Sequence, residues 1–590
     1  MTISPLMLLA ILGLFCATCT ASESLVKNGK CNSRIAILAS EKEAFLMDRA
    51  AQAIADTVNA WSGVKIPIEK VERLPEEPAI ILSTLDSLSP ELKDNPSIYK
   101  AEFMDDQGFA IVPILNKVFI VSRTSRGVFN GAVYLRDFKI DGSKVNLILD
   151  AKPVYRTPWM KGRAVYLLNI WGHEPLYTVS DWKVILDSLA WYGFETVYFW
   201  TSGHFPSKKF PQTYKWADHH FDSTAESKIA SVQDLAQIIE YGHQIGLRMY
   251  LGGGLGAWTG TGNLTSLKPE TMKTGSGIAA MSLCPSHPES RKAIVEYYKE
   301  MYDALPKADG LYIELADEFG ECVCEICSKP VDAFGSRQFG QSQITLVQEI
   351  AHTIWKDHPH AHFAFTNGYD EHKNDPAFYE AIKQMDNSKF EWMEARGSWE
   401  FPAAGGKLMP APYFSKKQMK WKIWEIMPLS EQVEIANRLS KEGWFGMIAD
   451  FSPGFSSGSL YGGVYGGSQS KLPVAIPFPV NKLPFALTYF VTREVMWDPT
   501  LTVEQVKERI QRRFFGAEAP AHLATDLWDL REILLVCSQS LKTSAEHAKL
   551  LESIEEHIRE AENNASPKTL ESLSIMKEAV DMIRKYTEPE

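Results

Sequence analysis

Hydrophobic residues are spaced in three different ways along the chain. Up to residue 150, short apolar runs mix with amphipathic segments, and from residue 161 to 450 runs of about five residues alternate regularly with helical spacing. After residue 501, apolar residues recur mainly at every third or fourth position. Short runs are typical of buried strands, and the longer recurrence is typical of amphipathic helices. The chain therefore divides into a small mixed segment, a long alternating segment and a helical segment.

The first segment predicts a small α/β domain over residues 30–150. Its polar and apolar residues indicate strands, amphipathic helices and one antiparallel strand pair that turns at Leu115-Asn116-Lys117. The expected strands cover residues 34–40, 79–83, 107–113 and 118–122, and the expected helices cover residues 41–61 and 126–138.

The alternating segment follows a linker with two prolines, residues 151–160. Strand–helix alternation predicts parallel strands, and eight of them predict a closed (β/α)8, TIM-like barrel over residues 160–490; an open doubly wound sheet is the structural competitor. Gly193 and Gly246 are expected to end two of the helices, and Gly252–Gly256 is expected to form a mobile loop. The expected strands cover residues 163–168, 196–200, 248–252, 311–316, 362–367, 390–394, 421–426 and 445–450.

The two ends of the chain have different characters. Residues 491–590 predict a helical region, with a helix over residues 503–515 and two or three packed helices after it. Residues 7–16 form an apolar run that small residues follow, which is typical of a signal peptide over residues 1–21. This run is too short to span a bilayer, and we expect an exported protein, periplasmic or secreted, without an integral membrane span.

Composition narrows the class of partner. The formal net charge is −12, which argues against nucleic acids and anionic membrane surfaces as binding partners. The apolar content of 45% is that of a globular protein, and 16 Trp and 21 Tyr offer aromatic faces that stack on sugar rings.

Acidic residues gather at the carboxyl ends of the expected strands, where a barrel carries its chemistry. Glycoside hydrolysis needs two carboxyl groups, one of which protonates the leaving oxygen while the other acts as nucleophile, base or orienting group. The candidate catalytic residues are Asp317, Glu318, Glu394 and Glu425.

Strand alternation selects among these acids. Successive side chains of a strand point to opposite faces. If Leu311, Ile313 and Leu315 face the surrounding helices, then Tyr312, Glu314 and Glu318 point into the barrel. The same argument, with Met393 facing the helices, points Glu394 inward. Glu318 is therefore the best candidate for the acid.

Other polar and aromatic residues near the strand ends are candidates for sugar binding. Tyr369 and Trp399 have glycines nearby, which favours exposure in loops, and residues 452–470 predict a flexible loop that acts as a lid. The candidate substrate-binding residues are Arg163, His204, Tyr369, Trp399, Trp424 and Asp450.

A cysteine cluster follows the acid pair. Cys322, Cys324 and Cys327, together with Cys284, are consistent with a four-thiolate metal site, with one or two disulfides, or with free thiols. We expect a structural role, since no histidine at a strand end is paired with them for catalysis. No catalytic metal and no cofactor is expected.

Two stretches resemble known glycosidases. The order of a Gly-Phe strand, a turn, a second strand and a helix that begins Arg126-Gly-Val-Phe-Asn-Gly131 resembles the accessory domain of family 20 hexosaminidases and family 67 α-glucuronidases. The segment from Tyr489 to Gly516, with Trp497-Asp-Pro499, resembles the end of the barrel and the following helices in the same families.

The resemblance implies roles for the acid pair. In family 20, an Asp-Glu pair follows the fourth strand in a His-x-Gly-Gly-Asp-Glu pattern; Asp317-Glu318 matches the pair, whereas the His and both Gly are replaced. By analogy Glu318 is the general acid and Asp317 orients the substrate's acetamido group. Family 67 uses a lone Glu here with acids on later strands, a part that suits Glu394 and Glu425. We expect an exported, hexosaminidase-like glycoside hydrolase that acts on a carbohydrate; the alternatives are an α-glucuronidase-like hydrolase and a catalytically silent carbohydrate-binding barrel.

Overall fold

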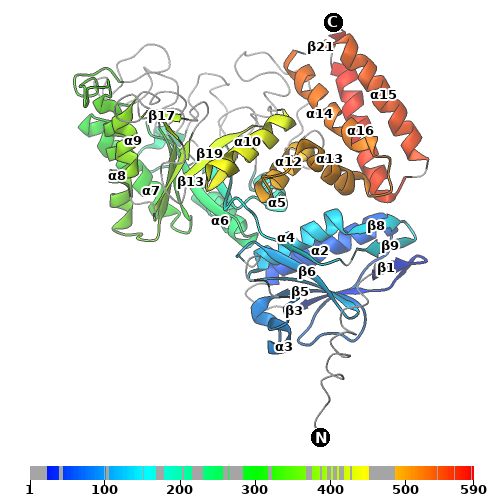
Figure 1. Ribbon diagram of the computed structural model, residues 1–590. Helices are drawn as coiled ribbons and strands as arrows, with labels where there is room; N and C mark the ends of the chain where they lie inside the picture. Colours follow the sequence, from blue (N-terminus) through cyan, green and yellow to red (C-terminus); the bar gives the residue numbers. More distant parts are fainter. Residues whose placement is uncertain are drawn as a thin grey trace. The chain divides into compact units, whose positions relative to one another are not determined.

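The computed structural model (Figure 1) gives the fold of the chain. It describes residues 23–38, 44–98, 100, 105–150, 152–167, 178–201, 205–214, 229, 231–256, 264, 283–315, 322–366, 375–385, 388–394, 400–402, 408–410, 418–424, 428–450, 485–540, 542–563, 565–586 and 588–589. The chain forms two compact units. Unit 1 comprises Met1–Pro158, Glu504–Leu530 and Glu546–Asp581, and unit 2 comprises Trp159–Val503, Arg531–Ala545 and Met582–Glu590.

Unit 1 contains a mixed six-stranded sheet. Its strands lie in the order β10-β6-β7-β5-β3-β4, and the β6–β7 pair is antiparallel, as the turn chemistry predicts. Helices α2 (Ala44–Ser62) and α4 (Ser125–Phe138) pack against this sheet and each other. The strands are β3 (Arg34–Leu38), β4 (Ile68–Lys70), β5 (Ala79–Thr84), β6 (Phe109–Ile114), β7 (Lys117–Ser122) and β10 (Val154–Arg156).

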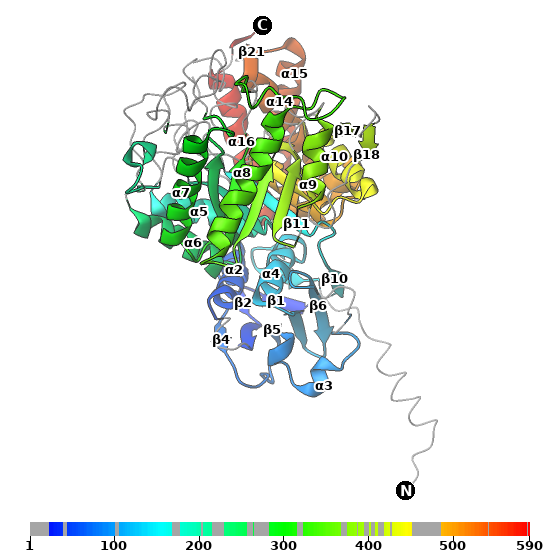
Figure 2. The ribbon, with the colours of Figure 1, turned by 90° about the vertical axis from the view of Figure 1, so that its left-hand side faces the viewer.

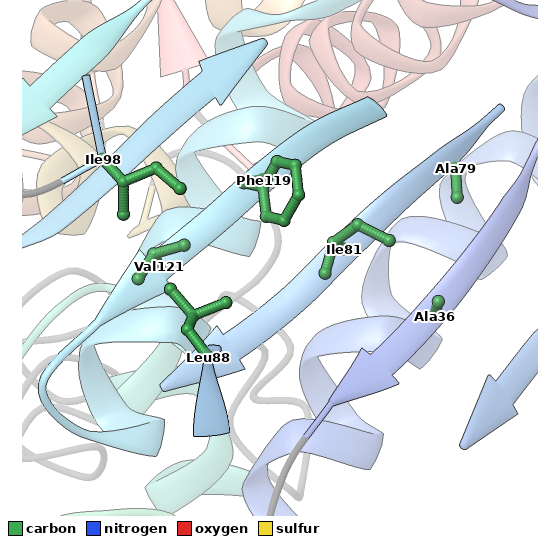
Figure 3. Packing of buried hydrophobic residues seen from close by; sticks show 7 residues of the cluster. All are labelled: Ala36, Ala79, Ile81, Leu88, Ile98, Phe119 and Val121. Atoms are coloured by element: carbon green, nitrogen blue, oxygen red, sulfur yellow. The ribbon is translucent and has the colours of Figure 1, made fainter. Parts of the chain in front are cut away.

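An apolar cluster fills one face of this sheet. Alternate residues of the central strands, such as Ile81 of β5 with Phe119 and Val121 of β7, point to the same side (Figure 3). Leu88 and Ile98, from the segment that includes the short helix α3 (Pro90–Lys93), cover them. The apolar runs that predicted these strands therefore also supply this part of the core.

A second sheet and most of the C-terminal helical residues complete unit 1. The sheet has the order β2-β1-β9-β8, from β1 (Glu23–Lys27), β2 (Lys30–Cys31), β8 (Ile140–Ser143) and β9 (Asn146–Leu149). The predicted helical region consists of α13 (Val503–Ile510) with a π-helical turn to Phe515, α14 (His522–Ser540), α15 (Ala545–Glu562) and α16 (Pro567–Tyr586). Lys568 on α16 donates a hydrogen bond of 3.0 Å to the carbonyl oxygen of Asp137 on α4, which ties the last helix to the N-terminal part of the unit.

Unit 2 contains eight parallel strands that close into a ring. Each strand pairs with the next, and the last pairs with the first, which is consistent with the predicted TIM-like barrel. The strands are β11 (Gly162–Leu167), β12 (Thr196–Trp200), β13 (Arg248–Gly254), β14 (Gly310–Glu314), β15 (His362–Thr366), β16 (Phe390–Glu394), β19 (Gln418–Trp424) and β20 (Gly446–Asp450).

Helices surround the ring, as Figure 2 shows for α8 and α9. Gly193 and Gly246 follow two of these helices with φ of +78° each, so both predicted helix ends are confirmed. The helices are α5 (Val179–Trp191), α6 (Val232–Gln244), α7 (Pro288–Ala304), α8 (Gln338–Trp355), α9 (Pro376–Lys383), α10 (Leu429–Glu442) and α12 (Phe485–Trp497).

Two details of unit 2 differ from the sequence analysis. The glycines that were expected to begin a mobile loop belong to β13, and a Cβ atom at Gly252 would lie 1.7 Å from the carbonyl oxygen of Tyr312 on β14. Glycine is therefore used here for close contact between neighbouring strands rather than for mobility. In addition, β17 (Glu400–Pro402) and β18 (Leu408–Pro410) form a small antiparallel pair between β16 and β19.

Within the described part of the chain, none of the helices combines the length and apolar character needed to cross a bilayer.

Candidate functional site

The carboxyl ends of the eight parallel strands meet at one face of the barrel. Three predicted site residues are the last residues of their strands: Glu394 of β16, Trp424 of β19 and Asp450 of β20. Trp424 and Asp450 are register partners, and Asp450 is also the partner of Tyr166 on β11. The backbone therefore brings these positions to the same edge, the edge that carries the chemistry in barrels of this kind.

A carboxylate lies inside the barrel just below this face. Glu314, the last residue of β14, is 5% exposed, and its Oε2 atom accepts hydrogen bonds from Tyr166 at 2.7 Å and from Tyr312 at 2.9 Å. Tyr166 comes from β11, which is not adjacent to β14, so the first bond crosses the interior. The inward orientation predicted for Tyr312 and Glu314 is confirmed.

A second polar layer lies nearer the amino ends of the strands. The carboxylate of Glu391 on β16 accepts hydrogen bonds from Tyr198 on β12 at 3.0 Å, from Tyr250 on β13 at 3.2 Å and from Arg248 at 3.2 Å. Arg248 also contacts Glu195 at 3.2 Å. Because three strands meet at a residue that is 1% exposed, this layer holds the barrel together from within.

Burial fixes the protonation state of the two tyrosines in this layer. It raises the pKa of Tyr198 and of Tyr250 well above the usual range, and the negative charge of Glu391 raises both further. Both hydroxyls consequently remain neutral donors at any physiological pH.

The contacts of Glu391 correct the alternation assigned to this strand. Glu391 faces the interior, whereas Trp392 packs against Phe365 and against Phe378 of α9, on the helix side. The prediction had the opposite parity, with Met393 facing the helices. The prediction was wrong at Glu391 and Trp392, because β16 has one acid at an odd and one at an even position. Polarity alone therefore could not show which of the two acids faces the interior. The side chain of Glu394 lies outside the described residues, and Glu391 is the interior acid that the sequence analysis missed.

Arg163 is placed where it cannot serve the predicted substrate role. It is the second residue of β11, at the opposite end of the barrel from the carboxyl ends, and is 1% exposed. Its guanidinium donates to the carbonyl oxygens of Gly193 at 3.0 Å and Met160 at 2.7 Å. The prediction of substrate binding is therefore corrected to a structural role at the base of the barrel.

The remaining predicted residues lie outside the described part of the chain. They are Asp317, Glu318 and Glu425 among the catalytic candidates, and His204, Tyr369 and Trp399 among the substrate-binding candidates. The lid predicted over residues 452–470 also lies outside it.

Four cysteine sulfurs converge beside the barrel. The Sγ atom of Cys284 lies 3.6 Å from that of Cys322, 3.7 Å from that of Cys327 and 3.8 Å from that of Cys324. The contact between Cys284 and Cys322 lowers the pKa of Cys322 and raises the pKa of Cys284. None of the four is disulfide-bonded in the structure.

A second group with metal-ligand chemistry lies in unit 1. On α14 and α15, the Oδ2 atom of Asp526 lies 3.0 Å from Nδ1 of His557 and 4.0 Å from Nε2 of His522. The two imidazoles are one-third exposed or more, so these are partly exposed His–Asp contacts at a protein surface.

Comparison with protein-family profiles finds no match, and comparison with curated protein sequences finds none either.

Solved structures share the fold. A GH138 enzyme targeting pectin rhamnogalacturonan II has a TM-score of 0.54 and 12% identity over 86% of this chain, which spans only 56% of that protein. The GH20 exo-β-N-acetylglucosaminidase from Vibrio harveyi has a TM-score of 0.51 and 12% identity, covering 86% of this chain and 75% of that one. These neighbours are glycoside hydrolases, and at this identity the likeness establishes a shared fold.

Proposed function

We propose that the chain is a glycoside hydrolase of the hexosaminidase type, with its active site at the carboxyl ends of the barrel strands. The observation that carries the proposal is the end of β14. This strand ends at Glu314 inside the barrel, and the Asp317-Glu318 pair begins three positions later in the sequence. An acid pair so soon after the end of a barrel strand supports a catalytic role, because barrels of this kind carry their chemistry at the carboxyl ends of the strands.

The pair supplies the two functions that the reaction needs. Glu318, as general acid, protonates the glycosidic oxygen while the carbonyl oxygen of the substrate's own acetamido group attacks the anomeric carbon. Asp317 holds that acetamido group in place. Water then opens the cyclic intermediate, and Glu318 takes the proton from that water, which restores its acid form.

The other strand ends offer groups for the sugar. In this proposal, Trp424 stacks on a sugar ring, Asp450 accepts hydroxyl hydrogen bonds, and Glu425 provides a further carboxylate, with His204, Tyr369 and Trp399 in the loops above. Glu314 acts as a positioning residue, because its two tyrosine bonds fix the strand that leads to the pair. The apolar run at residues 7–16 supports export to the periplasm or the medium.

The test is a set of carboxyl-to-amide substitutions. Glu318→Gln is expected to lower kcat/KM on aryl N-acetylhexosaminides by about 10³-fold while leaving sugar binding intact. The loss should be larger for a phenyl than for a dinitrophenyl leaving group, because a good leaving group needs no proton. Glu325→Gln is the matched control, since it changes an exposed carboxylate seven positions further along the same segment.

A substrate panel separates the versions of this proposal. Asp317→Asn should slow hydrolysis only of substrates with an acetamido group, so an equal loss on aryl uronides would favour the α-glucuronidase type. Full activity in Glu318→Gln would refute the assignment of the acid. Binding of oligosaccharides without turnover of any aryl glycoside would identify a carbohydrate-binding barrel instead.

A further inference from the structure

The four converging cysteines have the geometry of a metal site. Zinc binds four thiolates tetrahedrally at about 2.3 Å, which places neighbouring sulfurs about 3.8 Å apart. The three sulfur–sulfur distances from Cys284 are 3.6, 3.7 and 3.8 Å, and the four sulfurs all lie within 4.8 Å of one another. Bridging sulfurs of a disulfide would be about 2.0 Å apart.

The surroundings of the sulfurs are those of a closed structural site. Cys322 and Cys327 are fully buried, Cys284 is 2% exposed, and Phe339 of α8 packs against them. The backbone N–H of Cys327 donates to the sulfur of Cys324 at 3.4 Å, the kind of outer hydrogen bond that stabilises a metal-bound thiolate. Four protein ligands leave no open coordination position, so the site lacks the feature that catalytic zinc requires.

The two parts of the ligand set come from separate segments. Cys322-x-Cys324-x-x-Cys327 forms a compact knuckle, while Cys284 lies 38 residues earlier, ahead of α7. Beside Cys284, the hydroxyl of Ser286 lies 3.0 Å from the sulfur of Cys327 and bonds Ser342 on α8 at 2.7 Å. Ordinary packing of a buried thiol gives no reason for four of them to point at one centre from two segments.

We propose that Cys284, Cys322, Cys324 and Cys327 bind one structural Zn²⁺ ion, which clamps the segment after β14 to the segment before α7. Soft thiolates select zinc over calcium or magnesium, and a filled tetrahedral site also prevents these thiols from oxidising to disulfides. Only three residues separate Glu318 from Cys322, so the clamp fixes the chain close to the proposed acid. The metal site itself does not depend on the proposed activity.

Metal analysis of the full-length protein tests the proposal. Protein purified without chelators is expected to contain one zinc ion per chain, as measured by inductively coupled plasma mass spectrometry. The variants Cys322→Ser and Cys327→Ser should lose this zinc. Cys31→Ser is the matched control, because Cys31 is a cysteine of unit 1 without a disulfide, whereas the four clustered cysteines belong to unit 2, and this variant should keep full zinc. Cys324→His should also keep zinc, since imidazole replaces thiolate in three-cysteine, one-histidine sites.

A second readout covers variants that fail to fold. Wild-type protein in which Co²⁺ replaces the native ion should show the intense visible bands and sulfur-to-metal charge transfer of a tetrahedral thiolate complex. Folded protein that takes up neither Zn²⁺ nor Co²⁺ would overturn the proposal, as would iron in place of zinc or a disulfide between any two of these cysteines.

Discussion

Replacing Glu391 with alanine tests whether the lower polar layer stabilises the barrel. This carboxylate is 1% exposed and accepts hydrogen bonds from Tyr198, Tyr250 and Arg248, at 3.0, 3.2 and 3.2 Å. In the alanine variant, two buried hydroxyls and one guanidinium lose their shared acceptor. We expect a large loss in the free energy of unfolding, because unsatisfied buried groups are expensive.

The magnitude follows from these contacts. Removing one partner of a buried ion pair costs about 3–5 kcal/mol, and a hydrogen bond to a charged group contributes about 1.5–3 kcal/mol. Arg248 is one-third exposed and keeps Glu195 at 3.2 Å, which reduces its share of the penalty. The contributions overlap within one network, so the expected loss is about 4 kcal/mol for Glu391→Ala and about 2 kcal/mol for Glu391→Gln, which keeps the shape and one acceptor oxygen.

Equilibrium urea unfolding followed by tryptophan fluorescence measures this loss as a lower midpoint at constant slope. The companion variant Tyr250→Phe should cost about 1.5 kcal/mol alone, and less in the Glu391→Ala background, because its acceptor is already gone. A loss below about 1 kcal/mol for Glu391→Ala, or full additivity with Tyr250→Phe, would refute the network as a source of stability.

Two further predictions concern Asp309, which precedes β14, and Gly252 in β13. Burial alone would raise the pKa of Asp309, but hydrogen bonds from His243 at 2.8 Å and from a backbone N–H at 2.7 Å outweigh it and lower that pKa. Asp309 should therefore stabilise the fold fully above about pH 4 and lose this effect as pH falls through its lowered pKa. Urea unfolding at a series of pH values should show that the difference in free energy of unfolding between wild type and Asp309→Asn, about 1–2 kcal/mol near neutral pH, disappears in acid. A difference that grows in acid would contradict this explanation. Gly252→Ala should lower the free energy of unfolding by about 3 kcal/mol or more in the same assay, because its Cβ atom would lie 1.7 Å from the carbonyl oxygen of Tyr312. The control is Gly443→Ala, whose Cβ atom would meet nothing within 4 Å, and which should lose only about 1 kcal/mol because of its positive φ. Equal losses would show that contact between the strands is not the cause.

The architecture was predictable where the hydrophobic pattern is regular. Five-residue apolar runs separated by helical spacing are sufficient to predict a ring of parallel strands, and Gly193 and Gly246 mark helix ends by a conformation that only glycine adopts easily. The side-chain contacts inside the ring were less accessible. In Phe390-Glu-Trp-Met-Glu394, acids occupy both faces, and only the bonds from Tyr198 and Tyr250 across the interior identify Glu391 as the inward one.

The cysteine cluster shows a different limit. The sequence analysis grouped Cys284 with Cys322, Cys324 and Cys327, but cysteines with this spacing are compatible with a metal site, with disulfides or with free thiols. The fourth ligand, Cys284, is 38 residues away in sequence, and its distance from the others depends on how α7 and β14 pack. Such a convergence is a property of the folded chain.

The composition of unit 1 has a consequence for the order in which the protein is made. Its two sheets and the helices α2, α3 and α4 come from the first 158 residues, yet its remaining helices arrive only with residues 504–530 and 546–581. The bond between Lys568 and Asp137 joins residues 431 positions apart. Synthesis proceeds from the N-terminus, so the first part must wait, incompletely covered, until the entire barrel sequence has left the ribosome. A fragment cut after the first 158 residues would therefore lack the helices that complete its unit.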